Sequence, residues 1–537
     1  MAYFSLHAYD ADVWIPAFLG LNQADTGMNP DIRFAADCAN METPNGVLQP
    51  LAAPVEYQGE FADRVETLAS FTRRWYDGDG KNEWYVLCAG GKLYQKQAGS
   101  SAEWDAVTLP SGIDAYGCST WSWVTYEINQ EGSDNPIDVL LMSNAVDGMI
   151  MLVPPERPTT YGDLEEFTHL TLKAYTHLEL HSPKWTIRTV DTQGMKFGVI
   201  ERYAERIWGG AMPEDPDTLA YSRPFDPTNW TAAGPTEEPE DGAGDVMQPT
   251  WDGDRFHALK TFGNQLIAFK KNRVWRIMGT DPGEYTFKEQ FGGGTPYFST
   301  IVADTERILM ANRDGMEIYD GLSVAPYRHE LVEALWRTVN TGALDQMCAA
   351  LYKQKYYLAF PTGTSAKNNA MLVFDMTDGT VLAYEGISVE AFMPTEDELF
   401  MTTSTLPGKI MTLKQDSWAE NVSECCAPTR WVTPWIDFGY KRIQKGGFDL
   451  YFVPEVKDTA VELKISVQTE KKLKTKRYTV QPLTEAQKAA GKEHRGKRLH
   501  FGGAGRKFRV MIETEAGTTA PWRLIGGVQL VVETDPD

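Results

Sequence analysis

The segment Val139–Leu152, VLLMSNAVDGMIML, shows how most of this chain is built. Two apolar runs, 139–142 and 149–152, flank a turn that ends in Asp147-Gly148. Asp-Gly pairs adopt the positive φ angles that tight hairpin turns require, and short apolar runs bounded by turn residues are typical of strands. The segment therefore predicts a β-hairpin.

The hairpin pattern returns along the chain at intervals of roughly 40 to 60 residues, a spacing typical of radial repeat folds. The further copies pair 84–87 with 93–94, 266–269 with 274–277, 308–310 with 317–319, 356–360 with 371–374, and 399–401 with 410–411. A less regular copy covers 199–204, 206–209 and 219–222. With this copy included, the repeats predict a β-propeller of six or seven blades.

The repeats divide the chain into three predicted parts: an N-terminal arm at 1–60, a β-propeller at 61–420 and a C-terminal β-sandwich domain at 421–537. Prolines interrupt the arm, which we expect to contribute one or two strands and treat as a candidate for closing the ring. The last part shows alternating strand patterns without the blade spacing. They cover 431–438, 447–453, 461–469, 507–513 and 527–533. The predicted fold class is therefore all-β.

Two short helices are expected within this all-β chain. Apolar residues at i, i+3, i+4 and i+8 within 328–339, beginning at Leu331, predict an amphipathic helix between blades. The sequence Thr484–Gln487 has the form of a capping box, which opens at most a short helix before Gly491. Neither helix changes the fold class.

Charge is distributed unevenly along the chain. The formal net charge is −23, and an acidic surface repels phosphate, which argues against tight binding of DNA or RNA. The segment 441–509 has the opposite balance, with 18 Lys or Arg against 7 Asp or Glu. This segment is either a solvated face or a patch that docks on an acidic partner or on a neighbouring copy. Its candidate partner-facing residues are Lys471, Lys472, Lys474 and Lys476.

Two segments partly resemble metal sites. His177, Glu179 and His181 would lie on one face of a strand, but no further strong ligand group stands nearby, and alternating polar residues are common on solvent faces. The sequence 77–80, DGDG, resembles the start of a calcium loop, but Cys88 stands where that loop needs a bidentate glutamate. We interpret the two segments as a solvent-facing strand and a hairpin turn, and predict no metal site.

Enzyme signatures are missing as well. The chain has no G-x-S-x-G elbow, P-loop or H-E-x-x-H motif. A convergent carboxylate pair, as propeller glycosidases use, cannot be placed from sequence. We therefore predict no catalytic or cofactor-binding residue, no cofactor and no enzymatic activity.

Cysteine use and targeting signals indicate where the chain is made. None of the six cysteines has C-x-x-C spacing, and the adjacent pair Cys425-Cys426 disfavours an ordinary bridge. The first residues lack a basic region followed by an apolar one, and no run of about 20 apolar residues occurs. We expect synthesis in the cytoplasm, free thiols and no membrane span.

Several stretches together resemble one family. They are 206–209, 219–222 and 225–230, then 266–280, 292–295 and 308–321, and in the last part 434–439 and 522–527. Their succession resembles the β-propeller proteins of bacteriophage tails, especially the tail hub or nozzle proteins of short-tailed phages. The likeness covers about residues 60–415, and 434–439 and 522–527 look like the β-domains appended to such proteins.

The resemblance implies a structural protein of the virion tail, made in the host cytoplasm. Such proteins form a ring, commonly of six copies, so we expect a homohexamer below the portal and adaptor rings. The expected partners are other copies of the chain, the head-to-tail adaptor and portal, and tail fibre or distal tail proteins. DNA would leave through the lumen without specific binding.

Two other functions stay open at this point. A propeller binding module for host glycans would use rim loops such as Phe225–Trp230, whose aromatic side chains could stack on sugars, although packing within a blade accounts for the same loop. A propeller glycoside hydrolase or lyase is the third possibility, for which the sequence singles out no residue.

Overall fold

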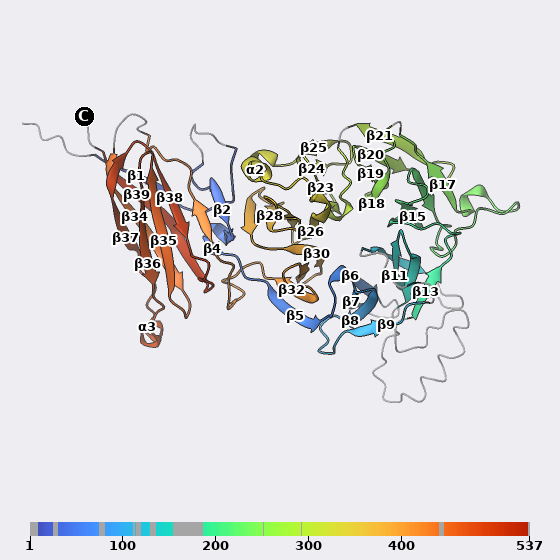
Figure 1. Ribbon diagram of the computed structural model, residues 1–537, viewed down its shortest axis with the longest axis horizontal. Helices are drawn as coiled ribbons and strands as arrows, with labels where there is room; N and C mark the ends of the chain where they lie inside the picture. The colour runs from blue at the N-terminus through green and yellow to red at the C-terminus, as the bar shows by residue number, and fades with distance from the viewer. Residues whose placement is uncertain are drawn as a thin grey trace, which may run out of the picture.

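The computed structural model describes residues 9–24, 31–74, 81–110, 113, 120–128, 136–153, 186–250, 252–291, 293–439 and 445–534. These residues are organised as two units that lie side by side (Figure 1). The larger unit consists of seven four-stranded antiparallel sheets between residues 55 and 413, and the smaller unit contains two larger sheets that face each other.

The seven sheets of the larger unit are the blades of a β-propeller. Blades 1 to 3 contain β6 (Val65–Arg74), β7 (Lys81–Ala89), β8 (Lys92–Gln97) and β9 (Asp105–Val107); β10 (Ser122–Ile128), β11 (Ile137–Asn144), β12 (Gly148–Val153) and β13 (Thr186–Val190); and β14 (Val199–Tyr203), β15 (Arg206–Gly210), β16 (Thr218–Tyr221) and β17 (Gly244–Met247). Blades 4 and 5 contain β18 (Phe256–Phe262), β19 (Gln265–Lys270), β20 (Arg273–Met278) and β21 (Thr286–Phe291); and β22 (Val302–Ala303), β23 (Ile308–Asn312), β24 (Gly315–Tyr319) and β25 (Val324–Pro326). Blades 6 and 7 contain β26 (Cys348–Tyr352), β27 (Lys355–Phe360), β28 (Ala370–Asp375) and β29 (Val381–Glu385); and β30 (Val389–Pro394), β31 (Leu399–Thr403), β32 (Lys409–Leu413) and β5 (Val55–Glu60).

The blades form a closed ring. Strand β6 contacts β11 of the second blade, and from there the first strand of each blade contacts the first strand of the next, as far as β30, which contacts β6. The last blade is completed by β5, whose Val55 pairs with Thr412 of β32. The propeller therefore begins at Val55 and not at the predicted residue 61, because its closing strand comes from the N-terminal side of the ring. Among the described residues the ring has seven blades.

The predicted hairpins are the two middle strands of each blade. Every residue of β11 and β12 is buried. Leu140 and Met142 belong to the core shared with blade 1, whereas Val139 and Leu141 belong to the core shared with blade 3. Most residues of these two strands are apolar because both faces of each strand pack against neighbouring blades. Gly148 supplies the positive φ, +96°, at the turn between the two strands.

The smaller unit, called the C-terminal unit below, contains two antiparallel sheets. One has the order β1 (Tyr9–Ile15), β39 (Trp522–Thr534), β34 (Lys445–Val456) and β37 (Lys497–Gly505). The other has the order β2 (Asp37–Ala39), β33 (Arg430–Val432), β38 (Phe508–Glu513), β35 (Val461–Thr469) and β36 (Leu473–Val480). The two sheets share one hydrophobic core, in which the Phe448 ring of β34 stacks on the Phe508 ring of β38 with centroids 5.4 Å apart.

The residues predicted as a separate N-terminal arm are divided between the two units. Strand β1 pairs along β39, from Tyr9–Thr534 to Ile15–Val528, and β2 pairs with β33. The arm prediction was therefore wrong for these strands, because their partners lie near the other end of the chain. The remaining short elements of this segment are β3 (Met41–Glu42), η1 (Pro44–Gly46) and β4 (Gln49–Pro50).

This N-terminal segment joins the propeller to the C-terminal unit. Leu21 donates its backbone N–H to Val381 O in blade 6, and the Phe18 ring meets the edge of the Trp431 ring in β33. Gly20 lies so close to blade 6 that a Cβ there would stand 2.2 Å from the Val381 carbonyl oxygen. One buried apolar cluster includes residues of the segment and of both units.

Both predicted helices are present. Helix α2 (His329–Trp336) lies between blades 5 and 6, as predicted, and buries Leu331, Val332 and Trp336. Ala334, expected on the apolar face, is exposed, and Val339 lies beyond the end of the helix. Helix α3 (Glu485–Ala489) starts with the predicted capping box at Thr484. Single-turn helices occur at η2 (Pro239–Asp241), η3 (Phe298–Thr300) and η4 (Leu344–Gln346). Across the described ranges, no helix has the length and apolar character needed to cross a membrane.

Candidate functional site

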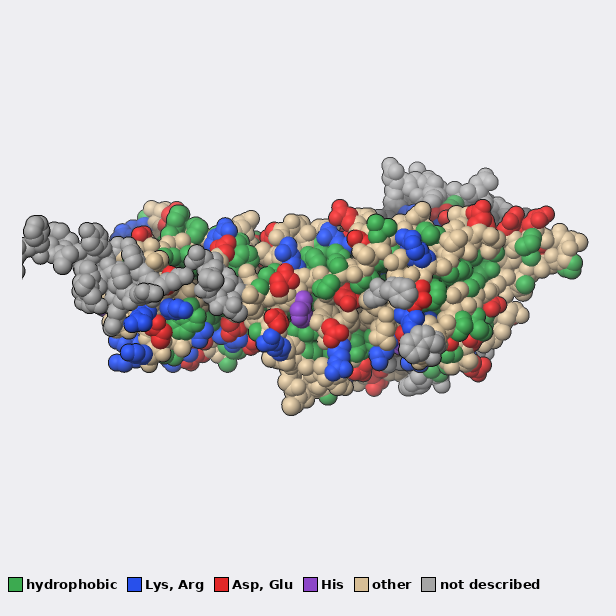
Figure 2. All heavy atoms as spheres, turned by 90° about the horizontal axis from the view of Figure 1, so that it is seen from above, with side chains coloured by type: hydrophobic (Ala, Val, Ile, Leu, Met, Phe, Trp, Pro, Cys, Tyr) green, Lys and Arg blue, Asp and Glu red, His purple; other side chains and the backbone are tan. Residues whose placement is uncertain are grey.

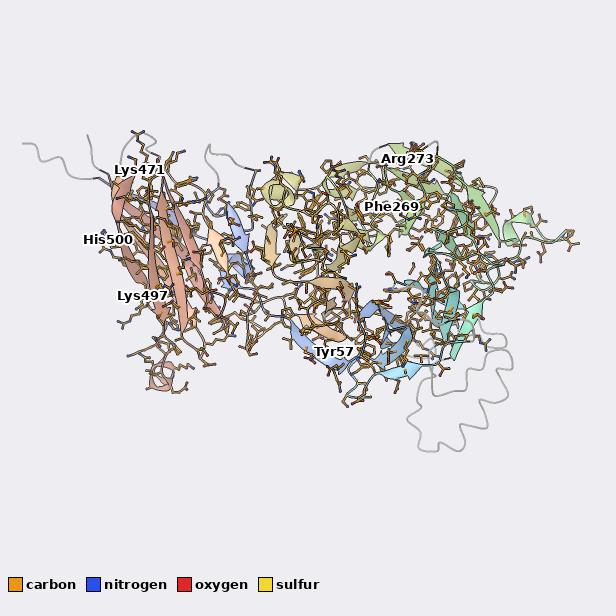
Figure 3. The ribbon with its side chains drawn as sticks, viewed as in Figure 1. Tyr57, Phe269, Arg273, Lys471, Lys497 and His500 are labelled. Atoms are coloured by element: carbon orange, nitrogen blue, oxygen red, sulfur yellow. The ribbon has the colours of Figure 1, made fainter. Side chains whose placement is uncertain are left out.

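The four lysines predicted to face a partner lie together on one edge of the C-terminal unit. Lys471 and Lys472 form the turn between β35 and β36, where Lys472 O accepts a hydrogen bond of 2.8 Å from Thr469 N. Lys474 and Lys476 follow in β36, the last strand of its sheet. All four are exposed. Figure 3 shows Lys471 on the side of this unit that lies away from the propeller.

The two lysines of β36 also cover the open side between the two sheets. They pair with Val467 and Ile465, whose side chains are buried in the shared core. Because paired residues point to the same face of a sheet, both lysines point inward at the edge. The Lys476 Nζ lies 5.7 Å from the centroid of the Phe501 ring in β37 of the opposite sheet.

Strand β37 makes the reciprocal contact. Lys497 Nζ lies 5.9 Å from the centroid of the Tyr478 ring in β36, and the Phe452 ring meets the same tyrosine edge to face at 5.8 Å. We call the contact of Lys474, Lys476 and Tyr478 with Lys497 and Phe501 the basic seam. Long lysine stems cover apolar surface while their charges stay in water, and inward charges at an edge strand oppose pairing with another chain. The seam lysines therefore also stabilise the fold of the C-terminal unit.

The basic side chains of this edge differ in whether they form ion pairs. Arg477 pairs with Glu462 at 2.9 Å and with Glu515 at 2.6 Å. Arg498 donates to Asp449 at 2.5 Å, and this hydrogen bond holds the pKa of the Asp449 carboxyl below its usual value. In contrast, within the part of the chain that the structure describes, no ion pair involves the turn lysines, Lys471 and Lys472, or the three seam lysines.

Opposite charges gather at the two ends of the molecule. On the face shown in Figure 2, the end formed by the C-terminal unit carries more Lys and Arg and the far end of the propeller more Asp and Glu, with charges of both signs scattered between them. The far end includes the loop 236–245, TEEPEDGAGD, whose residues from 236 to 241 are all exposed. The structure thus presents a basic end and an acidic end.

The rim loop Phe225–Trp230 does not offer Trp230 to a sugar. Trp230 is buried, its ring lies 4.8 Å from that of Phe197, and its Nε1 donates to Pro227 O at 3.1 Å. Interpreting Trp230 as a stacking residue was wrong, because it packs within its blade. Phe225 of the same loop is 63% exposed.

Other residues considered for chemistry add no second site. The segments 177–181 and 77–80 lie outside the described residues. In the ranges that are described, no three His, Cys, Asp or Glu side chains are grouped so that they could hold a metal ion. Five cysteines fall within those ranges and none is bonded to another. Burial raises the pKa of Cys38, and likewise of Cys425, to about 12, which keeps both as thiols.

The chain is similar to several solved structures, at low identity and low TM-score. No family model and no curated protein matches it. The CNH domain of AfRom2 is 10% identical with a TM-score of 0.32, over 68% of this chain and 99% of that one. The Pan2 WD40 domain of Neurospora crassa is 9% identical with a TM-score of 0.33, over 66% and 90%. An exo-β-1,3-galactanase of Phanerochaete chrysosporium is 12% identical with a TM-score of 0.23, over 62% and 94%. At these TM-scores the likenesses carry no argument, and the propeller is defined by its strand pairing and ring closure.

Proposed function

We propose that this protein is a structural subunit of a bacteriophage tail, a hub or nozzle protein that assembles as a ring of six copies below the portal and adaptor. The observation that carries the proposal is the separation of charge between an acidic propeller end and a basic edge whose turn and seam lysines form no ion pair among the described residues. A subunit with complementary ends can associate head to tail, and such contacts generate rings when the rotation closes.

In this arrangement the basic edge docks on an acidic surface of a neighbouring copy or of the adaptor. The wall of the lumen is acidic, so DNA stays hydrated and passes without specific binding. A basic wall would retain phosphate through counterion release. Because the screening length is about 8 Å at physiological salt, only side chains on the wall itself matter.

The test separates docking from folding. Reversing the turn lysines (Lys471→Glu, Lys472→Glu) leaves the seam untouched, so the melting temperature should not change. Ring assembly, followed by mass photometry of the purified protein and by incorporation into particles, should weaken by about tenfold or more in association constant. Reversing the seam lysines (Lys474→Glu, Lys476→Glu) should weaken assembly further, with a small loss of stability from the lost ring contact.

The matched control reverses two exposed propeller lysines, Lys271→Glu and Lys288→Glu, and should assemble normally. If the turn variant assembles as well as the wild type, the basic edge is not the docking surface. If the protein stays monomeric in purified virions or is absent from them, the proposed function itself is wrong.

A further inference from the structure

A pocket of about 470 Å³ lies at the mouth of the propeller's central channel. Its walls come from the beginnings of β6, β10, β26 and β30, the first strands of four blades, and from η3 of a fifth. A volume of this size is in the range of small-molecule sites, and the exposed lining of this pocket is more polar than apolar.

One wall carries a shared carboxylate. Glu390 of β30, whose side chain is 6% exposed, accepts from Arg64 Nε at 2.7 Å and from Lys367 Nζ at 3.1 Å. Glu66 and Asp345 line the same pocket. The cations of this pocket are Arg64 and Lys367, and its carboxylates are Glu66, Asp345 and Glu390. Because positive charge is not in excess, the pocket does not suit a phosphate group. Its polar groups instead offer several donors and acceptors around one space.

Two buried polar groups of the wall lack a partner among the described residues. Asn368, 3% exposed, donates its Nδ2 to Gln346 O and to Val389 O, but its Oδ1 accepts no hydrogen bond. Trp121, 2% exposed, has an Nε1 that donates none. A buried polar atom without a partner costs about 1–3 kcal/mol. Neither atom has accessible surface, so both belong to the packing of the wall, and a ligand in the pocket meets the more exposed side chains instead.

Two large aromatic side chains stand partly exposed in the same pocket. Trp123 of β10 is 37% exposed and Phe298 of η3 is 39% exposed. They belong to blades 2 and 5, which lie nearly opposite each other in a ring of seven. Exposed aromatic rings beside hydroxyl-binding groups are complementary to a pyranose. Its apolar C–H face can stack on an aromatic ring, and the hydroxyls on its edge can bind polar groups.

We propose that the channel mouth binds a short neutral oligosaccharide, with Trp123 and Phe298 as stacking platforms and Glu66 and Asp345 as hydroxyl-binding groups. The shared carboxylate Glu390 holds the two cations in place. The site does not depend on ring assembly, and it adds recognition of a surface polysaccharide to an assembly protein.

The test is an array of neutral and uronic-acid-containing oligosaccharides probed with the full-length protein, followed by titration calorimetry with the best-bound neutral trisaccharide. Trp123→Ala and Phe298→Ala should each weaken binding by about tenfold or more, since aromatic anchors dominate such contacts. Both rings are partly exposed, so the melting temperatures should stay close to that of the wild type. Phe225→Ala, on the rim of blade 3, is the control and should bind normally.

Absence of binding to every neutral oligosaccharide on the array would overturn the proposal. So would binding restricted to the acidic ones, or neutral binding unchanged in both aromatic variants. None of these outcomes bears on ring assembly, which the lysine variants test separately.

Discussion

Glu42 makes the stability of this protein depend on pH. The residue lies in β3, in the N-terminal segment that joins the two units, and is 5% exposed. Its Oε1 accepts hydrogen bonds of 2.7 Å from Gln49 Nε2 and from Ser417 N. Burial raises the pKa of Glu42 from 4.5 to about 7, and the nearby Asp416 carboxylate acts in the same direction.

The direction in which stability changes with pH follows from whether Glu42 binds a proton in the folded and in the unfolded chain. Below pH 4.5 the carboxyl is protonated in both folded and unfolded chains, so it does not change stability. Between pH 4.5 and 7 the unfolded chain ionises Glu42 while the folded protein keeps it neutral, so stability falls as pH rises. The full pKa difference corresponds to about 3 kcal/mol, most of which is lost between pH 5 and pH 8.

Glu42→Gln removes this titration and keeps an oxygen that can accept both hydrogen bonds. Urea denaturation followed by tryptophan fluorescence, at pH 5 and at pH 8, should show that the wild type loses about 2–3 kcal/mol more of its free energy of unfolding than the variant over this range. Glu214→Gln, at an exposed position, is the control and should behave as the wild type. If Glu42→Gln keeps the same pH dependence as the wild type, Glu42 does not titrate in this window and the reasoning fails.

Three further substitutions test the packing. Gly20→Ala would place a Cβ 2.2 Å from the Val381 carbonyl oxygen, so we expect a loss of about 2 kcal/mol or more and faster proteolysis of the N-terminal segment. Trp230→Ala should cost about 3–5 kcal/mol in thermal or urea unfolding, since the ring is 4% exposed; a change within experimental error would mean that the loop is not part of the blade core. Asp217→Asn leaves the fully buried Lys270 ammonium without its 2.6 Å counterion, and a loss of about 3 kcal/mol is expected in the same assay. A much smaller loss would show that the two backbone carbonyls bound by Lys270 suffice.

The propeller was predictable because its strongest signal is local. In each blade the two middle strands are adjacent in sequence, and in most blades they are largely buried and joined by a short turn, so the sequence shows them as paired apolar runs. The outer strands carry a weaker pattern; β9, for example, spans Asp105–Val107 and has no buried residue. The closing strand β5 has Val55 exposed and gives no apolar run either.

The strands of the C-terminal unit show what sequence patterns miss. Strand β35 was predicted with its observed bounds, Val461–Thr469, because its inward residues alternate with polar ones. Strands β36 and β37 were not predicted, because lysines and glycines occupy edge positions where a core strand would carry apolar residues. One or two strands were expected in the N-terminal segment, but the pairing of β1 with β39 and of β2 with β33 was not predicted because these partners are far away in sequence. The basic residues were found as a composition bias, whereas their contacts with Phe501 and Tyr478 depend on which strands meet.

The channel pocket could not be found from sequence at all. Its lining runs from Arg64 to Phe392 and is brought together by ring closure. No two of the residues that define its chemistry form a motif, and each occurs in an ordinary strand or loop context.

The long-range pairing of β1 and β2 has a consequence for synthesis. Asp37 pairs with Val432, and Tyr9 with Thr534. Strands β1 and β2 are therefore synthesised long before the strands with which they pair, β39 and β33. At a translation rate of roughly 5–20 residues per second, β2 waits roughly 20 to 80 s before β33 emerges. During that time the nascent chain exposes unpaired strand edges, and a chain terminated early cannot complete the C-terminal unit. Only a full-length chain presents the finished basic edge, so truncated copies are kept out of any assembly that requires it.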